Sequence, residues 1–126
     1  MNTDWRKLKE FEGIDLNDSF VLEWQSSEDE LVLSIEASIW PSSQHYEEPK
    51  ENEYTCYKKA QLFFSKCKSI AGIKAMAQAE SITDLDGSID YGNIDSLTKT
   101  DEGFNLIGEF GNVQIQGGKL GFKAHV

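Results

Sequence analysis

Cysteine is scarce in this chain of 126 residues, which has two, Cys56 and Cys67. Two thiols cannot form a framework of several disulfides, so the core must be stabilised by packing. The first residues contain no apolar segment of the kind that marks a secretory signal. No apolar run approaches the length needed to cross a membrane. We therefore expect a cytoplasmic protein with reduced thiols and no membrane contact.

Basic residues are also few, with 12 Lys and Arg against 22 Asp and Glu, which gives a net charge of −10. The imbalance argues against binding to nucleic acid or to an anionic membrane, because both require clustered cations. It is compatible with an acidic surface that steers a basic protein partner or a cation. Five lysines, interleaved with aromatic residues, form one basic island, which we interpret as a solvated strand face: Lys58, Lys59, Lys66, Lys68 and Lys74.

What the chain does contain is apolar residues at every second position. In the segment 31–40, Leu31, Leu33, Ile35, Ala37 and Ile39 alternate with more polar residues, which predicts a strand with one buried face. Similar alternation predicts strands at 20–25 and 54–64. The segment 15–18 is predicted to be a loop, and 26–29 is predicted to be the turn of a hairpin.

The C-terminal half repeats the same pattern. Alternation predicts a strand at 88–97 with a bulge at Gly92 and Asn93, followed by strands at 104–110, 113–116 and 120–124. Turns are expected at 111–112 and at 117–118. The segment 70–80 fits both a strand and a helix, and we favour the strand.

Together these patterns predict a single domain over residues 1–126. Its fold class is mainly β, with seven or eight antiparallel strands in a sandwich or a barrel-like sheet. The spacing of Trp5, Leu8 and Phe11 before Gly13 adds one short N-terminal helix. The sequence leaves the choice between sandwich and barrel open, and also the oligomeric state.

The segment 84–90 (Asp-Leu-Asp-Gly-Ser-Ile-Asp) resembles the middle of a calcium-binding loop. Its first and twelfth ligand positions would be Ile82 and Asn93, which do not suit calcium, so we interpret it as an Asp-Gly turn. Four carboxylates lie close together in this part of the chain, and such a cluster could carry acid/base chemistry: Asp84, Asp86, Asp90 and Asp95. We favour solvated acids of turns and edge strands.

The two histidines, His45 and His125, have no neighbouring His or Cys in the sequence. A metal site needs three or four ligands, so we predict no metal site and no cofactor. A nucleophilic pair of Cys56 and His45 is conceivable, but Cys56 is expected to be a small, half-buried packing residue.

The segment 41–53 is the longest polar, turn-rich stretch, and long loops on rigid scaffolds often carry binding residues. Trp40, His45 and Tyr46 lie in or beside it, and exposed aromatic side chains make good anchors for a partner. We select Trp40, His45, Tyr46 and Tyr57 as candidates for contact with a partner or ligand. The alternative is that Trp40 and Tyr46 cover an open end of the sheet.

Short segments across the chain, at 11–16, 37–41, 54–57 and 90–95, resemble small single-domain bacterial proteins of uncharacterised function. In size and charge the chain also resembles immunity proteins, which neutralise bacterial toxins. That resemblance implies a protein partner and no catalysis.

The first functional hypothesis is therefore a non-enzymatic protein-binding domain, either an inhibitor or an immunity-type partner. The second is a small-ligand or carbohydrate-binding β domain with Trp40, Tyr46 and Tyr57 in a pocket. The third is a hydrolase that uses the carboxylates between residues 84 and 95.

Overall fold

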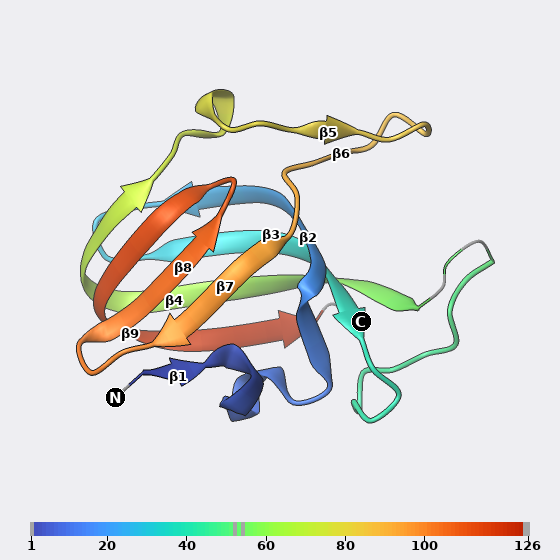
Figure 1. Cartoon of the computed structure of the whole chain (residues 1–126), viewed down its shortest axis with the longest axis horizontal. Coiled ribbons are helices and arrows are strands. Elements are labelled where there is room, and N and C mark those ends of the chain that lie inside the picture. The colour runs from blue at the N-terminus through green and yellow to red at the C-terminus, as the bar shows by residue number, and fades with distance from the viewer. Residues whose placement is uncertain (1, 52, 54, 125–126) are drawn as a thin grey trace.

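A computed structural model describes residues 2–51, 53 and 55–124 of the chain. These residues form one antiparallel sheet of seven strands in the order β1-β7-β8-β9-β4-β3-β2, together with a separate two-stranded hairpin, β5-β6 (Figure 1). The predicted antiparallel, mainly β fold is confirmed. The bounds are β1 Thr3–Asp4, β2 Ile14–Ser26, β3 Leu31–Ile39, β4 Cys56–Ile73, β5 Ile82–Thr83, β6 Ile89–Asp90, β7 Ile94–Lys99, β8 Gly103–Gly108 and β9 Gly111–Ala124.

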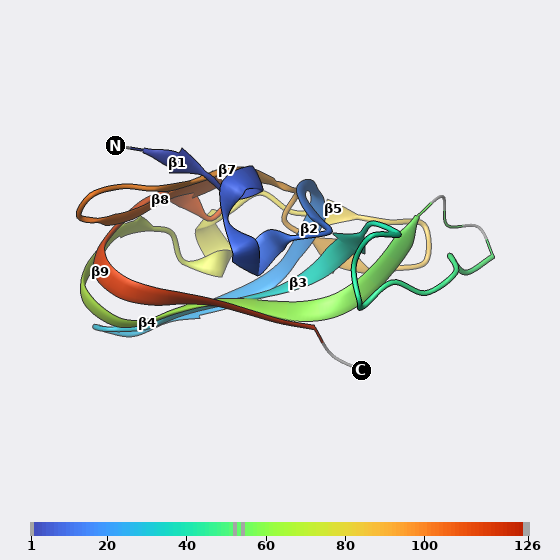
Figure 2. The same cartoon turned by 90° about the horizontal axis from the view of Figure 1, so that it is seen from below.

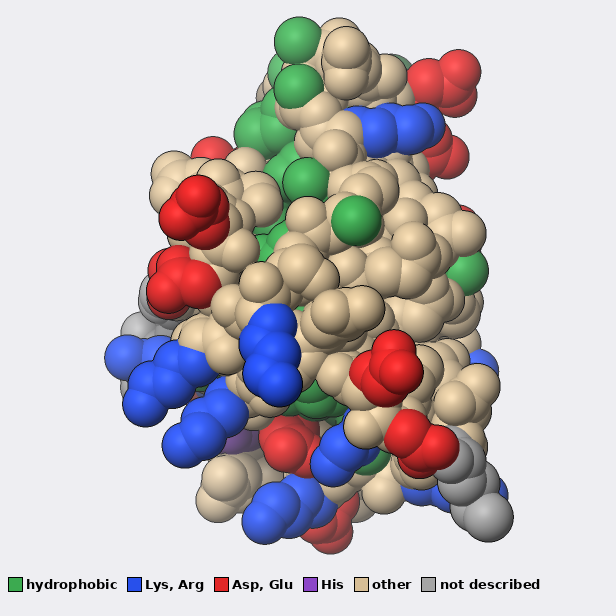
Figure 3. Space-filling view, turned by 90° about the vertical axis from the view of Figure 1, so that its left-hand side faces the viewer, with side chains coloured by type: hydrophobic (Ala, Val, Ile, Leu, Met, Phe, Trp, Pro, Cys, Tyr) green, Lys and Arg blue, Asp and Glu red, His purple; other side chains and the backbone are tan. Residues whose placement is uncertain are grey.

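The sheet folds over on itself and is not closed into a barrel (Figure 2). Strands β4 and β9 pair along almost their whole length, from Ala60 opposite Ala124 to Ile73 opposite Gly111. Both strands bend at the same end of the molecule, which faces the viewer in Figure 3. Because of this bend, β7 and β8 lie above the layer that contains β2 and β3. The result is sandwich-like.

The turn predicted at residues 117–118 is wrong, because β9 is continuous there. Gly117 and Gly118 have φ values of +67° and +91°, which let the strand bend sharply. The ladder with β4 skips a residue at this point and then resumes, with Ser69 opposite Gln116. Because β4 continues past the two glycines and pairs with β9 on both sides of them, the ladder contains a bulge there and β9 does not reverse direction.

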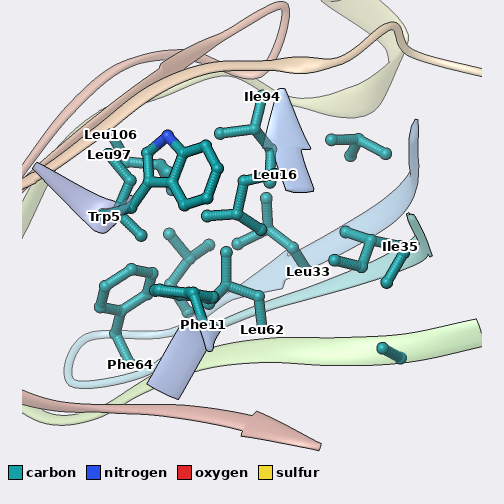
Figure 4. Packing of buried hydrophobic residues seen from close by; sticks show 14 of the residues in the cluster. Trp5, Phe11, Leu16, Leu33, Ile35, Leu62, Phe64, Ile94, Leu97 and Leu106 are labelled. Atoms are coloured by element: carbon teal, nitrogen blue, oxygen red, sulfur yellow. The ribbon is translucent and has the colours of Figure 1, made fainter. Parts of the chain in front are cut away.

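The core lies between the two layers (Figure 4). The five alternate residues predicted for the buried face of β3 are all fully buried: Leu31, Leu33, Ile35, Ala37 and Ile39. In β4 the alternate residues Cys56, Ala60, Leu62 and Phe64 are buried as well, whereas Lys58 between them is half-buried. Period-two alternation therefore identified both central strands.

The N-terminal segment contains two 3₁₀ turns, η1 (Trp5–Lys7) and η2 (Lys9–Phe11), where a single helix was predicted. Leu8 lies between them in an extended conformation, and its amide closes the first turn on the Trp5 carbonyl. Trp5 and Phe11 are both buried, with ring centroids 6.3 Å apart. The two rings therefore reach the core from separate short turns, and Leu8, the third residue of the spacing, is half-buried.

The loop predicted at 15–18 is also wrong, because these residues belong to β2. The register between β2 and β3 is irregular between Asp15 and Phe20. There the Ser19 hydroxyl donates to the Asp15 carbonyl at 2.6 Å and accepts from the Ser38 amide at 3.0 Å. A buried serine thus takes the place of regular ladder bonds, which polar composition alone does not reveal.

The segment 70–80 is neither a complete strand nor a helix, since β4 ends at Ile73 and a 3₁₀ turn follows, η3 (Met76–Gln78). The strand predicted at 88–97 is divided into β6 and β7, with Gly92 at φ +77° between them. The amide of Val21 donates to Gly92, and the amide of Tyr91 donates to Val21, both at 2.8 Å. These bonds tie the base of the β5-β6 hairpin to the edge strand β2.

Candidate functional site

The β5-β6 hairpin is the part of the fold that contributes least to the core. It extends beyond the sheet at the end of the molecule opposite the bend (Figures 1 and 2). Its strands pair through Ile82 with Asp90 and Thr83 with Ile89. Ile82 and Ile89 are 57% and 52% exposed, and Leu85 at the tip is fully exposed. Three large apolar side chains therefore face solvent on one small projection.

Hydrogen bonds hold the tip of this hairpin in a defined turn. The amide of Gly87 donates to the Asp84 carbonyl at 2.9 Å, and the amide of Asp84 donates to the Ser88 carbonyl at 2.8 Å. The Asp86 carboxylate accepts from the Ser88 amide at 2.9 Å and from its hydroxyl at 2.6 Å. These two bonds to Ser88 lower the pKa of Asp86. The interpretation of this segment as an Asp-Gly turn is confirmed.

The four carboxylates of the predicted cluster have different surroundings. Asp84 and Asp86 both accept from Ser88 at the exposed tip. Asp90 is buried at the base, where its carboxylate accepts from the Gly92 amide at 2.9 Å. Asp95 is exposed on β7. Among the described residues, no group of three or more His, Cys, Asp or Glu side chains could hold a metal ion.

The hairpin and its flanks carry charge of a single sign. Residues 75–98 contain five acidic residues and no Lys or Arg, so half of the net charge of −10 lies in this segment. The same segment holds the three exposed apolar side chains. Antiparallel pairing of Ile82 with Asp90 and of Thr83 with Ile89 puts the two isoleucines on opposite faces of the hairpin, and Leu85 lies at the tip. Exposed apolar side chains rimmed by polar groups are typical of a protein-interaction surface.

The residues that the sequence selected for binding lie in different places. Trp40 follows β3 and is 42% exposed, and its amide donates to the Gly13 carbonyl. His45 lines a hollow of about 410 Å³ together with charged residues such as Lys9 and Glu12. Tyr46 packs against the core. The structure places no two of these three side chains in the same described hollow.

Tyr57, the fourth candidate, lies on β4 and lines a hollow of about 370 Å³ whose other residues are mostly Glu and Lys. Its hydroxyl donates to the Asp18 carboxylate at 3.1 Å, and the Ser38 hydroxyl donates to the same oxygen at 3.0 Å. Its ring packs against Phe20, with centroids 5.7 Å apart. Asp18 thus joins β2, β3 and β4, a contact that was missed because its partners are distant in sequence.

Four lysines of the basic island are spread along β4, and Lys74 follows its end. Lys58 forms an ion pair with Glu47 at 2.9 Å, whereas Lys66 and Lys68 are exposed at the bend. Lys119 lies there too, opposite Ser65. Figure 3 shows basic side chains gathered on the lower part of this end of the molecule, with acidic ones among them. The mixture does not form a continuous basic track.

Both cysteines are free and buried. Burial raises the pKa of Cys67, and the nearby charges of Asp29 and Glu30 raise it further. A thiol that stays protonated is a poor nucleophile. Cys56 lies on the buried face of β4 and is buried more deeply than the half-buried position predicted for it. His125 lies outside the described residues.

No protein-family model, curated protein or solved structure matches this chain. No helix in the described part of the chain is long and apolar enough to span a membrane. Function must therefore be argued from the geometry itself.

Proposed function

We propose that this chain is a non-enzymatic domain that binds another protein, in the manner of an inhibitor or immunity-type partner. The observation that carries the proposal is the exposure of Ile82, Leu85 and Ile89 on a hairpin outside the core. Folding alone does not explain these side chains, because a polar residue at the same positions would sacrifice little buried apolar area.

Contact with a partner would give these side chains a role. Full burial of one Leu or Ile side chain contributes about 1.5–3 kcal/mol. Leu85 has all of its surface to bury, and Ile82 and Ile89 have about half of theirs. A partner pocket that encloses both faces of the hairpin would gain roughly 3–6 kcal/mol from the three together, before the cost of association. A contribution of that size is typical of the few residues that dominate an interface.

The excess of acidic residues supports the same proposal. A net charge of −10 speeds association with a basic protein and makes that association sensitive to salt. The exposed acids of the hairpin segment would contribute to both effects.

The test is affinity capture from the source cell at low and at high salt. The bait is the full chain, and the control is the triple variant Ile82→Ser, Leu85→Ser, Ile89→Ser. We expect one protein to be retained by the wild type, lost by the variant and weakened by salt. Both baits must have the same melting temperature, so that loss of folding cannot explain the result. If no protein is captured at either salt concentration, the proposal is wrong.

A second candidate function is small-ligand binding, and one hollow favours it. It measures about 460 Å³, within the usual range for ligand sites, and lies beside the bend. Leu8, Phe104 and Leu120 are among its apolar lining residues, and Lys99 and Lys119 also line it. Glu10, Asp101 and Glu102 line the hollow as well, so charges of both signs surround its apolar part, which suits a small zwitterion with an apolar group. A thermal-shift screen with such zwitterions, repeated on Lys119→Glu, tests this candidate, and the absence of any shift would contradict it.

The carboxylate-dependent hydrolase stays a hypothesis with less support. Asp84 and Asp86 accept hydrogen bonds within the turn, and Asp90 accepts one at the base. These bonds give each of the three carboxylates a structural role.

A further inference from the structure

Leu85 occupies the second position of a turn that hydrogen bonds within the hairpin define. Gly87 closes the turn on Asp84, and Ser88 is held by the Asp86 carboxylate. A Cβ atom at Gly87 would meet nothing within 4 Å, so the surroundings of the turn are open. Because the turn is ordered on folding, its backbone would lose little further entropy on binding.

The charges around Leu85 restrict what could cover it. Asp84 and Asp86 flank it directly, and no Lys or Arg occurs between residues 75 and 98. Phosphate backbones and anionic bilayers would be repelled. A second copy of the hairpin would bring the same negative charge. A protein surface rich in Lys and Arg is the occupant whose charge complements the site.

We infer that Leu85 is an anchor that inserts into an apolar pocket rimmed by Lys or Arg side chains on a basic partner protein. The inference rests on the proposed function and adds to it the contact point and the chemistry of the partner surface. Ile82 and Ile89 lie on opposite faces of the hairpin behind the tip, so a pocket that encloses the tip would contact one isoleucine on each face.

The experiment uses the full chain with a benzophenone amino acid as the photoreactive probe, placed at one position at a time. Position 85 tests the hairpin, and position 40 tests the loop 41–53. Position 116 is the control, because Gln116 is exposed on β9, far from both segments in the sequence. Irradiation in the source cell is followed by mass spectrometry of the cross-linked peptides.

We expect position 85 to capture a protein well above the control, through peptides that combine apolar residues with Lys or Arg. Capture of an acidic surface, of a second copy of this chain, of lipid or of nucleic acid at position 85 overturns the inference. Protein capture at position 40 without capture at position 85 overturns it as well, but leaves the proposed function intact. If none of the three positions captures a macromolecule, both fail.

Variants then measure binding to the captured protein. Leu85→Ser should weaken binding about 10- to 100-fold, and Leu85→Met, which keeps the apolar volume, should stay within about threefold. Asp86→Asn keeps an acceptor for Ser88 but removes the charge, so it should reduce the dependence of affinity on salt. Equal affinity of the Ser and Met variants would overturn the role of Leu85 as an anchor.

Discussion

The exposure of Leu85 can be tested against a matched leucine in the core. Leu33 is fully buried in the middle of β3, opposite Trp24 on one side and Leu62 on the other. Leu85 is fully exposed at the hairpin tip. The same substitution, Leu to Ala, removes the same atoms at both positions. Any difference between the two variants therefore reports the surroundings of the side chain.

The expected magnitudes differ widely. Leu33→Ala loses the transfer free energy of its side chain and leaves a cavity, which costs about 2–5 kcal/mol. Leu85→Ala removes no contact with the folded chain, so the free energy of unfolding should stay within about 0.5 kcal/mol. For a chain of 126 residues, 1 kcal/mol corresponds to about 3–5 °C in Tm. Leu33→Ala should therefore lower Tm by roughly 6–25 °C, and Leu85→Ala by about 2 °C at most.

Thermal and urea unfolding, followed by tryptophan fluorescence, measure both changes. Trp5 and Trp24 are buried and report loss of the core directly. A loss of more than about 1 kcal/mol in Leu85→Ala would mean that this side chain is covered in solution. A Tm that rises with protein concentration in the wild type but not in the variant would show that a second copy of this chain covers Leu85. Either result would refute the argument that a different protein binds there.

Three further outcomes are expected. Gly103→Ala should abolish the native fold or lower Tm by more than 10 °C, since its Cβ would lie 1.9 Å from the Ile115 carbonyl oxygen; a normal Tm would contradict the close strand approach. Asp18→Ala should cost about 1–3 kcal/mol in urea unfolding, because it removes the acceptor of the Ser38 and Tyr57 hydroxyls. The control Asp95→Ala, at an exposed position, should change stability by less than about 0.5 kcal/mol. Equal losses in the two variants would contradict the role of Asp18 in joining the strands. Cys67 should be alkylated by iodoacetamide slowly in the folded chain and rapidly in urea, and fast alkylation of the folded chain at neutral pH would contradict the burial. The free energy of unfolding should fall as pH rises through the ordinary thiol pKa of 9.0, because the folded state holds the proton of Cys67 more tightly than the unfolded state does.

The alternation of apolar residues was enough to predict the central strands. Leu31 to Ile39 in β3 and Cys56 to Phe64 in β4 bury the side chains that the pattern indicated. In these strands one face contacts the core along the whole length, so burial follows the period of the backbone. The antiparallel fold class followed from several such strands joined by short turns.

The pattern failed where a contact distant in sequence determined the local structure. Gly117 and Gly118 are typical turn residues, yet β4 continues past them and keeps β9 in the sheet. Ser19 lies in a polar stretch, yet its hydroxyl joins β2 to Ser38 of β3. In both cases a partner strand supplied hydrogen bonds that local propensity does not include.

For the candidate site, the sequence by itself determined the chemistry of the tip. Asp84, Asp86 and Gly87 specify a turn through local hydrogen bonds and backbone freedom, and such interactions are complete within five residues. Only the tertiary structure decided that Ile82, Leu85 and Ile89 would be left in solvent. Their apolar character is compatible with burial, and burial depends on whether another layer lies over the hairpin. The folded sheet closes its core without them, because β4 and β9 bend to cover it, and so the hairpin remains free to meet a partner.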